Sequence, residues 1–336
     1  MKRSLLDLGV LCCPECGGDL DLSATREEGA EIMEGEFSCL GCQRRFGLKG
    51  GVPRLLPDLV PPEAVQTTEG FSYEWHLFDK ILDVYEQQFL DWIAPVRPEF
   101  FKDKFVLEGG CGKGRHTALA SRYGARAVVA MDLSSAVDVC FRNCGRKTNV
   151  HVIQGDILKP PLRDEFDYAY SVGVLHHLTD PRAGYVSLAS KVKKGGHVSA
   201  WVYGREGNWW IIGILNPIRL AITSRLPKGL LLAFSWVLTL PLWLAVKLVY
   251  GPLGRGPLKP LGRFLFYFDY LSYISRLSFW DLHSLVFDHL VPSLAFYIRR
   301  SEVEEWVHAA NGELKDIGWH NRNSWRFLAH VPLGKV

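Results

Sequence analysis

A glycine-rich segment constrains the fold of this chain more than any other feature. Residues 105–109 are apolar apart from Glu108, glycines stand at positions 110, 112 and 114, and residues 115–121 favour a helix. Glycines at alternate positions permit positive φ angles and let backbone N–H groups approach a ligand at the start of a helix. The segment therefore predicts a strand, a tight turn and a helix N-terminus that together form a binding turn.

A second apolar segment makes a nucleoside the expected ligand. Residues 127–131 are apolar and lead to Asp132, about 20 residues after the glycines, where an acid in α/β folds binds ribose hydroxyls. The glycines match neither the dinucleotide pattern G-x-G-x-x-G nor the phosphate loop, since Lys113 is followed by Gly114 instead of Ser or Thr. We therefore expect a different nucleoside-containing ligand.

The glycine segment resembles the first motif of the class I S-adenosylmethionine-dependent methyltransferases, V-L-[DE]-x-G-x-G-x-G. The matching residues are Val106, Leu107, Glu108, Gly110, Gly112 and Gly114. The resemblance implies an α/β fold with a doubly wound, seven-stranded Rossmann-like sheet and S-adenosyl-L-methionine as cofactor. It also implies a set of cofactor-binding residues, namely Glu108, Gly109, Gly110, Cys111, Gly112, Gly114, Asp132, Leu133, Asp156, Ile157 and Val172. A glycine turn in another doubly wound enzyme is the alternative.

The remaining strand-like segments fit the same sheet. Residues 150–156 and 166–172 predict the third and fourth strands, and residues 191–203 predict a helix end, a Gly-Gly turn and a fifth strand. Asp156 ends the third strand, where the resemblance implies a hydrogen bond to the adenine amino group; a helix or turn cap is the alternative. A helix at 302–310 and a hairpin at 314–320 and 324–330 would close the sheet. Two helical segments precede the first strand, at 69–78 and 84–93, and their aromatic residues suit either packing or a cover for the pocket.

The segment after the fourth strand carries the catalytic candidates. Residues 174–178, Val-Leu-His-His-Leu, resemble the corresponding part of small-molecule methyltransferases, especially those of quinone biosynthesis. The Asn-Pro-Pro-Tyr or Asp-Pro-Pro-Tyr segment of enzymes that methylate amino groups of DNA bases and glutamine is absent. His176 and His177 are candidate general bases, although one of them can instead cap the next helix. Further pocket candidates are Tyr203, which we also count as catalytic, Asp288, His289 and Tyr297.

Two Cys-x-x-Cys pairs near the N-terminus predict a metal centre. Cys13 and Cys16 form one pair and Cys39 and Cys42 the other, a spacing that favours one structural zinc ion with four thiolate ligands. The region resembles small zinc-ribbon modules, and iron–sulfur ligation and redox thiols are the alternatives. Cys12 is the spare thiol. The N-terminal residues do not resemble a secretory leader, and eight cysteines without one favour a reducing, cytoplasmic compartment.

An insertion between the fifth strand and the closing helix has an unusual composition. Residues 205–263 contain one acid, Glu206, against eight basic residues, which gives a local charge of +7 within a chain whose net charge is only +3. Residues 229–246 carry no charge and could span a bilayer, although Pro241 would kink such a helix. A buried helical cap over the active site and an interfacial helix pair on anionic lipid are the alternatives to spanning. The basic residues are Arg205, Arg219, Arg225, Lys228, Lys247, Arg255, Lys259 and Arg263, and they stand among Trp209, Trp210, Trp236 and Trp243.

These patterns predict five parts and one main function. The parts are a zinc ribbon (1–56), a linker with N-terminal helices (57–100, the linker at 57–64), the cofactor-binding core (101–204), a helical cap (205–299) and the end of the sheet (300–336). We expect a methyltransferase that acts on a small, hydrophobic or lipid-like acceptor in the cytoplasm, with peripheral membrane contact through 205–263. An RNA methyltransferase that uses the ribbon to recognise its substrate is the second hypothesis, with nucleic acid a less favoured partner. The third is a non-catalytic adaptor that binds the cofactor.

Overall fold

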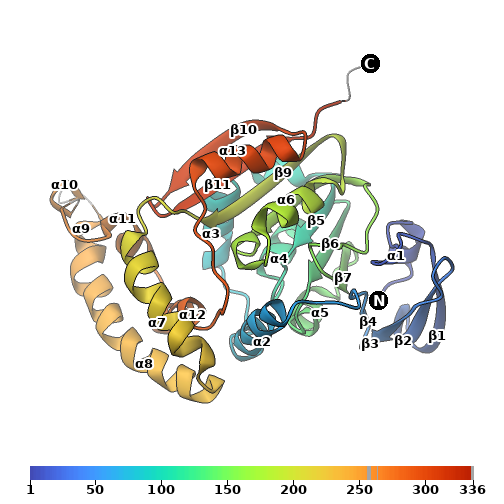
Figure 1. Ribbon diagram of the computed structural model, residues 1–336, viewed down its shortest axis with the longest axis horizontal. Coiled ribbons are helices and arrows are strands. Elements are labelled where there is room, and N and C mark those ends of the chain that lie inside the picture. Colours follow the sequence, from blue (N-terminus) through green and yellow to red (C-terminus); the bar gives the residue numbers. More distant parts are fainter. Residues whose placement is uncertain (256–258, 263, 334–336) are drawn as a thin grey trace.

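A mixed sheet of seven strands forms the centre of the molecule (Figure 1). The computed structural model describes residues 1–255, 259–262 and 264–333. The strand order is β10-β11-β9-β8-β5-β6-β7, with β9 to β7 parallel and β11 antiparallel to both of its neighbours. The strands are β5 Phe105–Gly109, β6 Ala127–Asp132, β7 Val150–Gln154, β8 Phe166–Val172, β9 Val192–Tyr203, β10 Glu313–His320 and β11 Ser324–His330. This order confirms the predicted doubly wound sheet and its closing hairpin.

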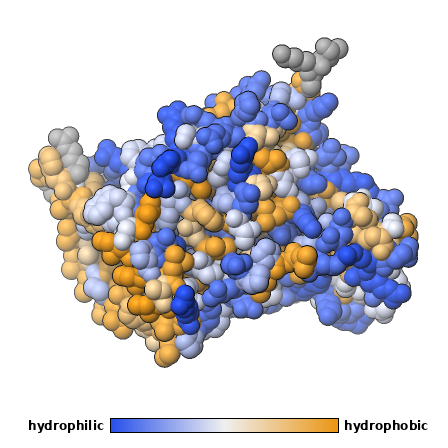
Figure 2. All heavy atoms as spheres, viewed as in Figure 1, coloured by the Kyte–Doolittle hydropathy of each residue, from blue (hydrophilic) through white to orange (hydrophobic). Residues whose placement is uncertain are grey.

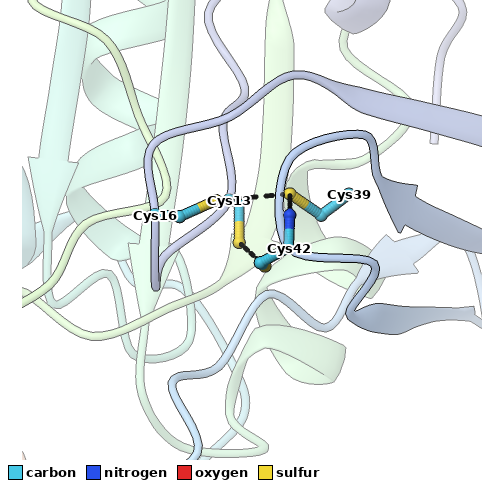
Figure 3. Close-up of side chains that lie close together, drawn as sticks. All are labelled: Cys13, Cys16, Cys39 and Cys42. Carbon is cyan, nitrogen blue, oxygen red and sulfur yellow. Dashed lines mark hydrogen bonds between the residues drawn. The ribbon is translucent and has the colours of Figure 1, made fainter.

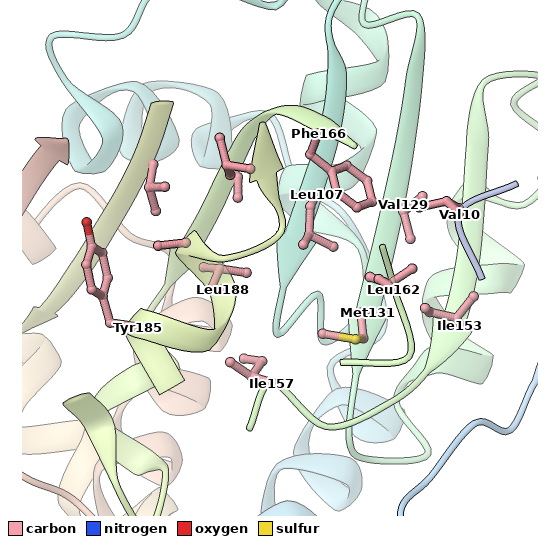
Figure 4. Close-up of a cluster of buried hydrophobic side chains, with 14 of the residues drawn as sticks. Val10, Leu107, Val129, Met131, Ile153, Ile157, Leu162, Phe166, Tyr185 and Leu188 are labelled. Carbon is pink, nitrogen blue, oxygen red and sulfur yellow. The ribbon is translucent and has the colours of Figure 1, made fainter. Parts of the chain in front are cut away.

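Helices cover both faces of the sheet because neighbouring residues of each strand point to opposite sides. Val106 of β5 packs in one buried cluster with Phe89 and Leu119, whereas Leu107 packs in the other with Leu188 (Figure 4). The helices on the first side are α3 Val84–Ile93, α4 Arg115–Arg122 and α5 Val137–Cys144, and those on the second are α6 Pro181–Ala189 and α13 Arg300–Ala309. A short 3-10 turn, Pro98–Phe101, leads into β5.

The N-terminal ribbon packs directly on the β7 edge of the sheet. Its backbone continues the hydrogen bonding there, since the Leu55 N–H donates to the Gln154 carbonyl at 2.9 Å. Val10 shares a buried cluster with Leu162 and Ile153 of the core (Figure 4). The ribbon therefore covers a strand edge that would otherwise be open. Its elements are α1 Ser4–Asp7, β1 Leu20–Glu28, β2 Glu31–Cys39, β3 Arg45–Lys49 and β4 Val52–Pro53.

Two local predictions were wrong at their boundaries. Helix α2, Pro62–Leu77, begins inside the predicted linker 57–64, because proline fits the first turn of a helix, where its missing N–H costs nothing. The Gly-Gly pair at 195–196 lies inside β9 and not before it. The pairing of β8 with β9 shifts there, from Phe166 opposite Val192 to Tyr168 opposite His197, and Gly195 takes a φ of 83°. An irregularity in the pairing of β9, which contains the Gly-Gly pair, thus takes the place of a turn before the strand.

The insertion forms a helical cap at the end of the molecule opposite the ribbon (Figure 1). Its long helix α8 continues into a π-helical turn and α9, so that Lys228–Leu253 is one helical segment, long and apolar enough to cross a membrane by length and composition. Only 22% of its most apolar window is buried. The cap elements are the π-helical turns Ile211–Leu215 and Val246–Tyr250, the 3-10 turn Thr223–Arg225, and α7 Asn216–Ala221, α8 Lys228–Ala245, α9 Gly251–Leu253, α10 Lys259–Gly262, α11 Phe268–Ile274 and α12 Phe279–Leu290.

Candidate cofactor pocket and metal centre

A large pocket opens at the carboxyl ends of β5, β6, β8 and β9, where doubly wound sheets bind ligands. Its empty space, together with solvent at its open mouth, is about 1830 Å³. The floor comes from the strand ends of the sheet. The walls come from α2 and α3 on one side and from the cap helices α11 and α12 on the other.

The glycine turn has the geometry that its sequence predicts. Gly110, Gly112 and Gly114 all take positive φ angles, of 85°, 50° and 86°. A Cβ atom on Gly110 would overlap the side chain of Val174, and one on Gly112 would lie 2.9 Å from the indole nitrogen of Trp75. Glycine is therefore required both by the backbone and by the close approach of neighbouring residues. Trp75 places α2 directly against the turn.

Asp132 joins this turn to the end of β6. Its Oδ2 accepts a hydrogen bond from the Gly112 N–H at 2.8 Å, and its Oδ1 accepts from the backbone and hydroxyl of Ser134 at 2.8 and 2.7 Å. Each carboxylate oxygen can accept two hydrogen bonds, so Oδ1 is fully used and Oδ2 keeps capacity for one ligand hydroxyl. Asp156 accepts from the Leu158 N–H at 2.8 Å and also borders the pocket. The turn-cap alternative for Asp156 is thus observed, and it is compatible with a ligand contact.

Glu108 lies behind the pocket rather than in its lining. Its carboxyl is 1% exposed, and it accepts a hydrogen bond from the hydroxyl of Thr117 and lies 3.7 Å from Nδ1 of His116. Burial raises the pKa of Glu108 to about 8 and lowers the pKa of His116. Of the predicted cofactor set, Gly110, Cys111, Gly112, Asp132, Leu133, Asp156, Ile157 and Val172 line the pocket, while Glu108, Gly109 and Gly114 support it from behind.

A cationic side chain at the start of α4 was not predicted. The guanidinium of Arg115 lies 5.3 Å from the ring centroid of Trp75, 5.4 Å from that of Tyr85 and 5.6 Å from that of Trp92, and it lines the pocket beside the glycine turn. The aromatic residues of α2 and α3 therefore pack around Arg115 and also cover the pocket, so both predicted roles apply. Spacing alone gave no sign that three aromatic rings from two separate segments surround one arginine.

The two candidate histidines differ in their surroundings. His177 lines the pocket, and its Nδ1 lies 2.6 Å from the Leu294 carbonyl. Because a carbonyl only accepts, Nδ1 carries the proton and Nε2 is left as an acceptor. Burial lowers the pKa of His177 to about 3, so the ring stays neutral near pH 7. His176 is fully buried outside the lining, and neither of its ring nitrogens has a hydrogen-bond partner among the described residues.

The end of the pocket far from the glycine turn is polar as well as aromatic. Tyr203 and Asp288 both line it, and burial raises the pKa of Asp288. Glu74 of α2 borders the same region; it accepts from the Ser284 hydroxyl at 2.9 Å, and burial raises its pKa well above its ordinary value. Tyr267, Tyr270, His289 and Tyr297 complete this end. Glu74 and the first two tyrosines were not predicted, although the helical spacing of Tyr267 and Tyr270 was visible in the sequence.

The four predicted metal ligands meet in one cluster (Figure 3). Their sulfurs all lie within 4.8 Å of one another, with 3.7 Å between Cys13 and Cys42 and 3.4 Å between Cys16 and Cys39. Tetrahedral thiolates about 2.3 Å from a zinc ion are about 3.8 Å apart, so the cluster fits zinc. The Cys42 N–H donates to the Cys39 sulfur at 3.4 Å and lowers the pKa of this thiol to about 6. Cys12 is buried outside the cluster.

Comparison with known proteins agrees with this architecture. Residues 107–200 match the family model described as a methyltransferase domain. The matched segment contains the glycine turn, Asp132, Asp156 and the two histidines. Residues 107–200 thus match a methyltransferase domain, as the motif resemblance implied.

Individual relatives match only part of the chain. An uncharacterized protein of Synechococcus sp. is 31% identical over 44% of this chain and 35% of its own length. A tRNA U34 carboxymethyltransferase of Shewanella loihica is 33% identical over 29% of this chain and 31% of its own length. The chain therefore spans about a third of the curated relatives it matches. Among solved structures, magnesium protoporphyrin IX methyltransferase of Synechocystis PCC 6803 with bound SAH aligns with a TM-score of 0.45 and 13% identity, covering 80% of this chain and 96% of that one.

Proposed function

We propose that this chain is an S-adenosylmethionine-dependent methyltransferase that acts on a small, largely apolar acceptor in the cytoplasm and in contact with a membrane. The observation that carries the activity is the glycine turn, which lies at the carboxyl end of β5 and is hydrogen-bonded to Asp132 of the neighbouring strand. The cofactor would supply an electrophilic methyl group on a sulfonium centre. The chain would supply binding and orientation, and a proton acceptor where the methylated group carries a proton.

The pocket lining offers a partner for each part of the cofactor. Asp132 would accept a hydrogen bond from the ribose through Oδ2, and Asp156 and Ile157 would contact the adenine. Arg115 would be the cationic partner for the carboxylate of the methionine moiety, since it lines the pocket beside the glycine turn, whereas the ammonium group of Lys113 donates to the Phe78 carbonyl and the Tyr85 hydroxyl. Glu108 is then a structural residue that holds the turn from behind.

The acceptor would occupy the end of the pocket formed by the cap. In the transfer, a lone pair of the acceptor attacks the methyl carbon, the carbon–sulfur bond breaks towards sulfur, and the acceptor loses a proton if it carries one. His177 is suited to accept a hydrogen bond from the acceptor through Nε2, since its low pKa makes it a weak proton carrier. Asp288, whose pKa is raised by burial, is the better proton acceptor.

Methyl-labelled cofactor tests this proposal. The purified chain is incubated with the labelled cofactor and cell extracts, which are then partitioned between organic solvent and water. We expect label in the organic phase, and none with a Gly112→Ala variant, whose Cβ would collide with Trp75. Label in the water phase alone would contradict the apolar acceptor. Cofactor binding without label in either phase would favour the non-catalytic adaptor.

An RNA acceptor is the second candidate, because one group of relatives carries the name of a tRNA-modifying enzyme. Basic residues of the cap or ribbon would then bind phosphates, and the logarithm of tRNA affinity would fall steeply with the logarithm of salt concentration. Filter binding of tRNA at several salt concentrations distinguishes the two candidates. We expect weak binding, because the cap's basic residues stand among leucine and tryptophan side chains.

A further inference from the structure

Helix α8 turns its few hydroxyl side chains towards the protein and most of its large apolar side chains towards solvent, unlike an ordinary surface helix. Its buried residues are Leu231, Ser235 and Thr239, four residues apart, so two of the three positions facing the protein carry hydroxyls. Surface helices of soluble proteins place apolar residues inwards and polar residues in water. The outward side of α8 instead carries Leu230, Phe234, Trp236, Val237, Leu238, Leu240 and Leu244, each at least 39% exposed.

The inward side is fixed along its length, so the outward side is a permanent surface. Leu231 packs with Phe287 of α12 near the start of α8, and Val246 packs with Ile274 and Leu282 beyond its end. Between them the Ser235 hydroxyl lies 2.8 Å from Nε2 of His283. These contacts hold α8 against α12. They argue against an arrangement in which α8 separates from the protein and crosses a bilayer alone.

The apolar surface extends beyond α8 to the neighbouring cap segments. Among the described residues, the exposed large hydrophobic side chains concentrate between positions 209 and 280, and Figure 2 shows this concentration over α7 and α8. Trp209 is 70% exposed, Leu248 70% and Trp280 59%. Contiguous exposed surface of this kind marks an interaction site. We call it the apolar cap face: the outward side chains of α8 together with Trp209, Ile214, Ile218, Ile222, Leu248 and Trp280.

Positive charge borders the part of this face formed by α7, α8 and α9, which contain no acid, and the carboxylate of Asp281, next to Trp280, accepts a hydrogen bond from Ser278. No acid occurs between Glu206 and Asp269 in the sequence, whereas Arg225 and Lys228 stand at the start of α8 and Arg255 follows α9. The two flanking acids are occupied elsewhere, Glu206 by the indole N–H of Trp325 and Asp269 by Arg322.

Two of the predicted basic residues do not contribute to this border. Arg219 is 1% exposed, so the prediction that it meets lipid headgroups is wrong. Lys247 is half-buried and donates to the Ser275 carbonyl at 2.6 Å. Arg263 lies outside the described residues. The solvent-exposed positive charge therefore lies at the two ends of the helical segment Lys228–Leu253.

We propose that the apolar cap face lies flat in the headgroup and acyl boundary of an anionic lipid bilayer. The segment Lys228–Leu253 is about 39 Å long at 1.5 Å per residue, and basic residues at both ends place both ends at the same headgroup layer. The face exposes Trp209, Trp236 and Trp280, and tryptophan side chains suit that layer. A second copy of this chain is a poorer occupant, because a two-fold contact would oppose basic ends to basic ends with no acid between them.

The proposed membrane face lies one helix away from the pocket. Ser284 and Asp288 of α12 line the pocket, while His283 and Phe287 of the same helix contact α8. An apolar acceptor dissolved in the bilayer would thus be held close to the cap wall of the pocket. This last step rests on the proposed function, whereas the lipid surface stands on its own geometry.

Co-sedimentation with vesicles tests the surface. The full chain is mixed with phosphatidylcholine vesicles that contain or lack about one third phosphatidylglycerol, at increasing sodium chloride. We expect binding to the anionic vesicles that weakens as salt rises. Val237→Asp should reduce binding at least tenfold, and Arg225→Gln about fivefold. Leu59→Asp and Arg182→Gln, exposed positions away from the cap, are the matched controls and should bind like the wild-type chain.

Three outcomes would overturn the inference. The first is no sedimentation with anionic vesicles, and the second is binding that Val237→Asp leaves unchanged. The third is a dimer in analytical ultracentrifugation that Val237→Asp dissociates, which would assign the face to a second copy. Titration with S-adenosylhomocysteine on the same samples separates these failures from failure of the proposed function, since Val237 lies outside the cofactor pocket.

Discussion

Replacing Glu108 with Gln should remove a pH-dependent loss of stability. The carboxyl is buried between β5 and α4, and burial raises its pKa from 4.5 to about 8. Gln has nearly the same shape, stays neutral at every pH, and keeps an oxygen that can accept the hydrogen bond from Thr117. The substitution therefore changes the titration and little else.

The sign and size follow from proton binding. Since the folded pKa lies above the unfolded one, the folded chain binds the extra proton between pH 4.5 and about 8. Stability from this group is fully present below 4.5 and is lost as pH rises through 8. Each pH unit costs about 1.4 kcal/mol, on the order of 5 kcal/mol over the whole interval. The free energy of unfolding of the Glu108→Gln chain should not fall by this amount.

Urea denaturation of both chains from pH 5 to pH 9 measures the effect. The difference between the two free energies of unfolding is the useful quantity, because other groups titrate alike in both chains. His177, whose pKa is lowered to about 3, is one of them, and it acts in the opposite direction. Glu165→Gln, at an exposed position, is the control and should track the wild-type chain. A difference between Glu108→Gln and wild type that stays constant with pH would refute the reasoning.

Three further outcomes are expected. Asp132→Asn replaces an acceptor oxygen by a donor and removes the charge, so calorimetry should show S-adenosylhomocysteine affinity weaker by about 1.5 to 3 kcal/mol; unchanged affinity would move the ribose site elsewhere. Elemental analysis should find about one zinc per chain, retained in Cys12→Ser and lost with the folded ribbon in Cys16→Ser; a fully folded ribbon without metal would contradict the site. His177→Asn keeps a donor towards Leu294 but loses Nε2, so methyl transfer should slow by about tenfold to a hundredfold with cofactor binding intact, whereas the exposed control His308→Asn should leave both unchanged.

Local patterns predicted the residues that lie at strand ends and in tight turns. The positive φ angles of Gly110, Gly112 and Gly114 and the place of Asp132 follow from sequence spacing, because a strand and the turn after it are set by neighbours in the chain. The metal ligands were predictable for the same reason, because each Cys-x-x-Cys pair is a local pattern. Only the contact between the two pairs depends on the fold.

Contacts between distant segments were not predictable from one sequence. Glu74 and Ser284 meet in the pocket although they are 210 positions apart, and no pattern in either segment indicates the other. Helix α8 was ambiguous for a different reason. Its sequence is apolar all round, so periodicity could not show that Ser235 and Thr239 face the protein while leucines face outwards.

Isothermal titration with S-adenosylhomocysteine tests the central claim most directly, because it requires no knowledge of the acceptor. The account predicts one binding site per chain, no comparable binding of NADH or ATP, and loss of the site in Gly112→Ala, where a Cβ would strike Trp75. Binding of NADH or ATP in preference to S-adenosylhomocysteine, or affinity that Gly112→Ala leaves unchanged, would contradict a methyltransferase site at this turn.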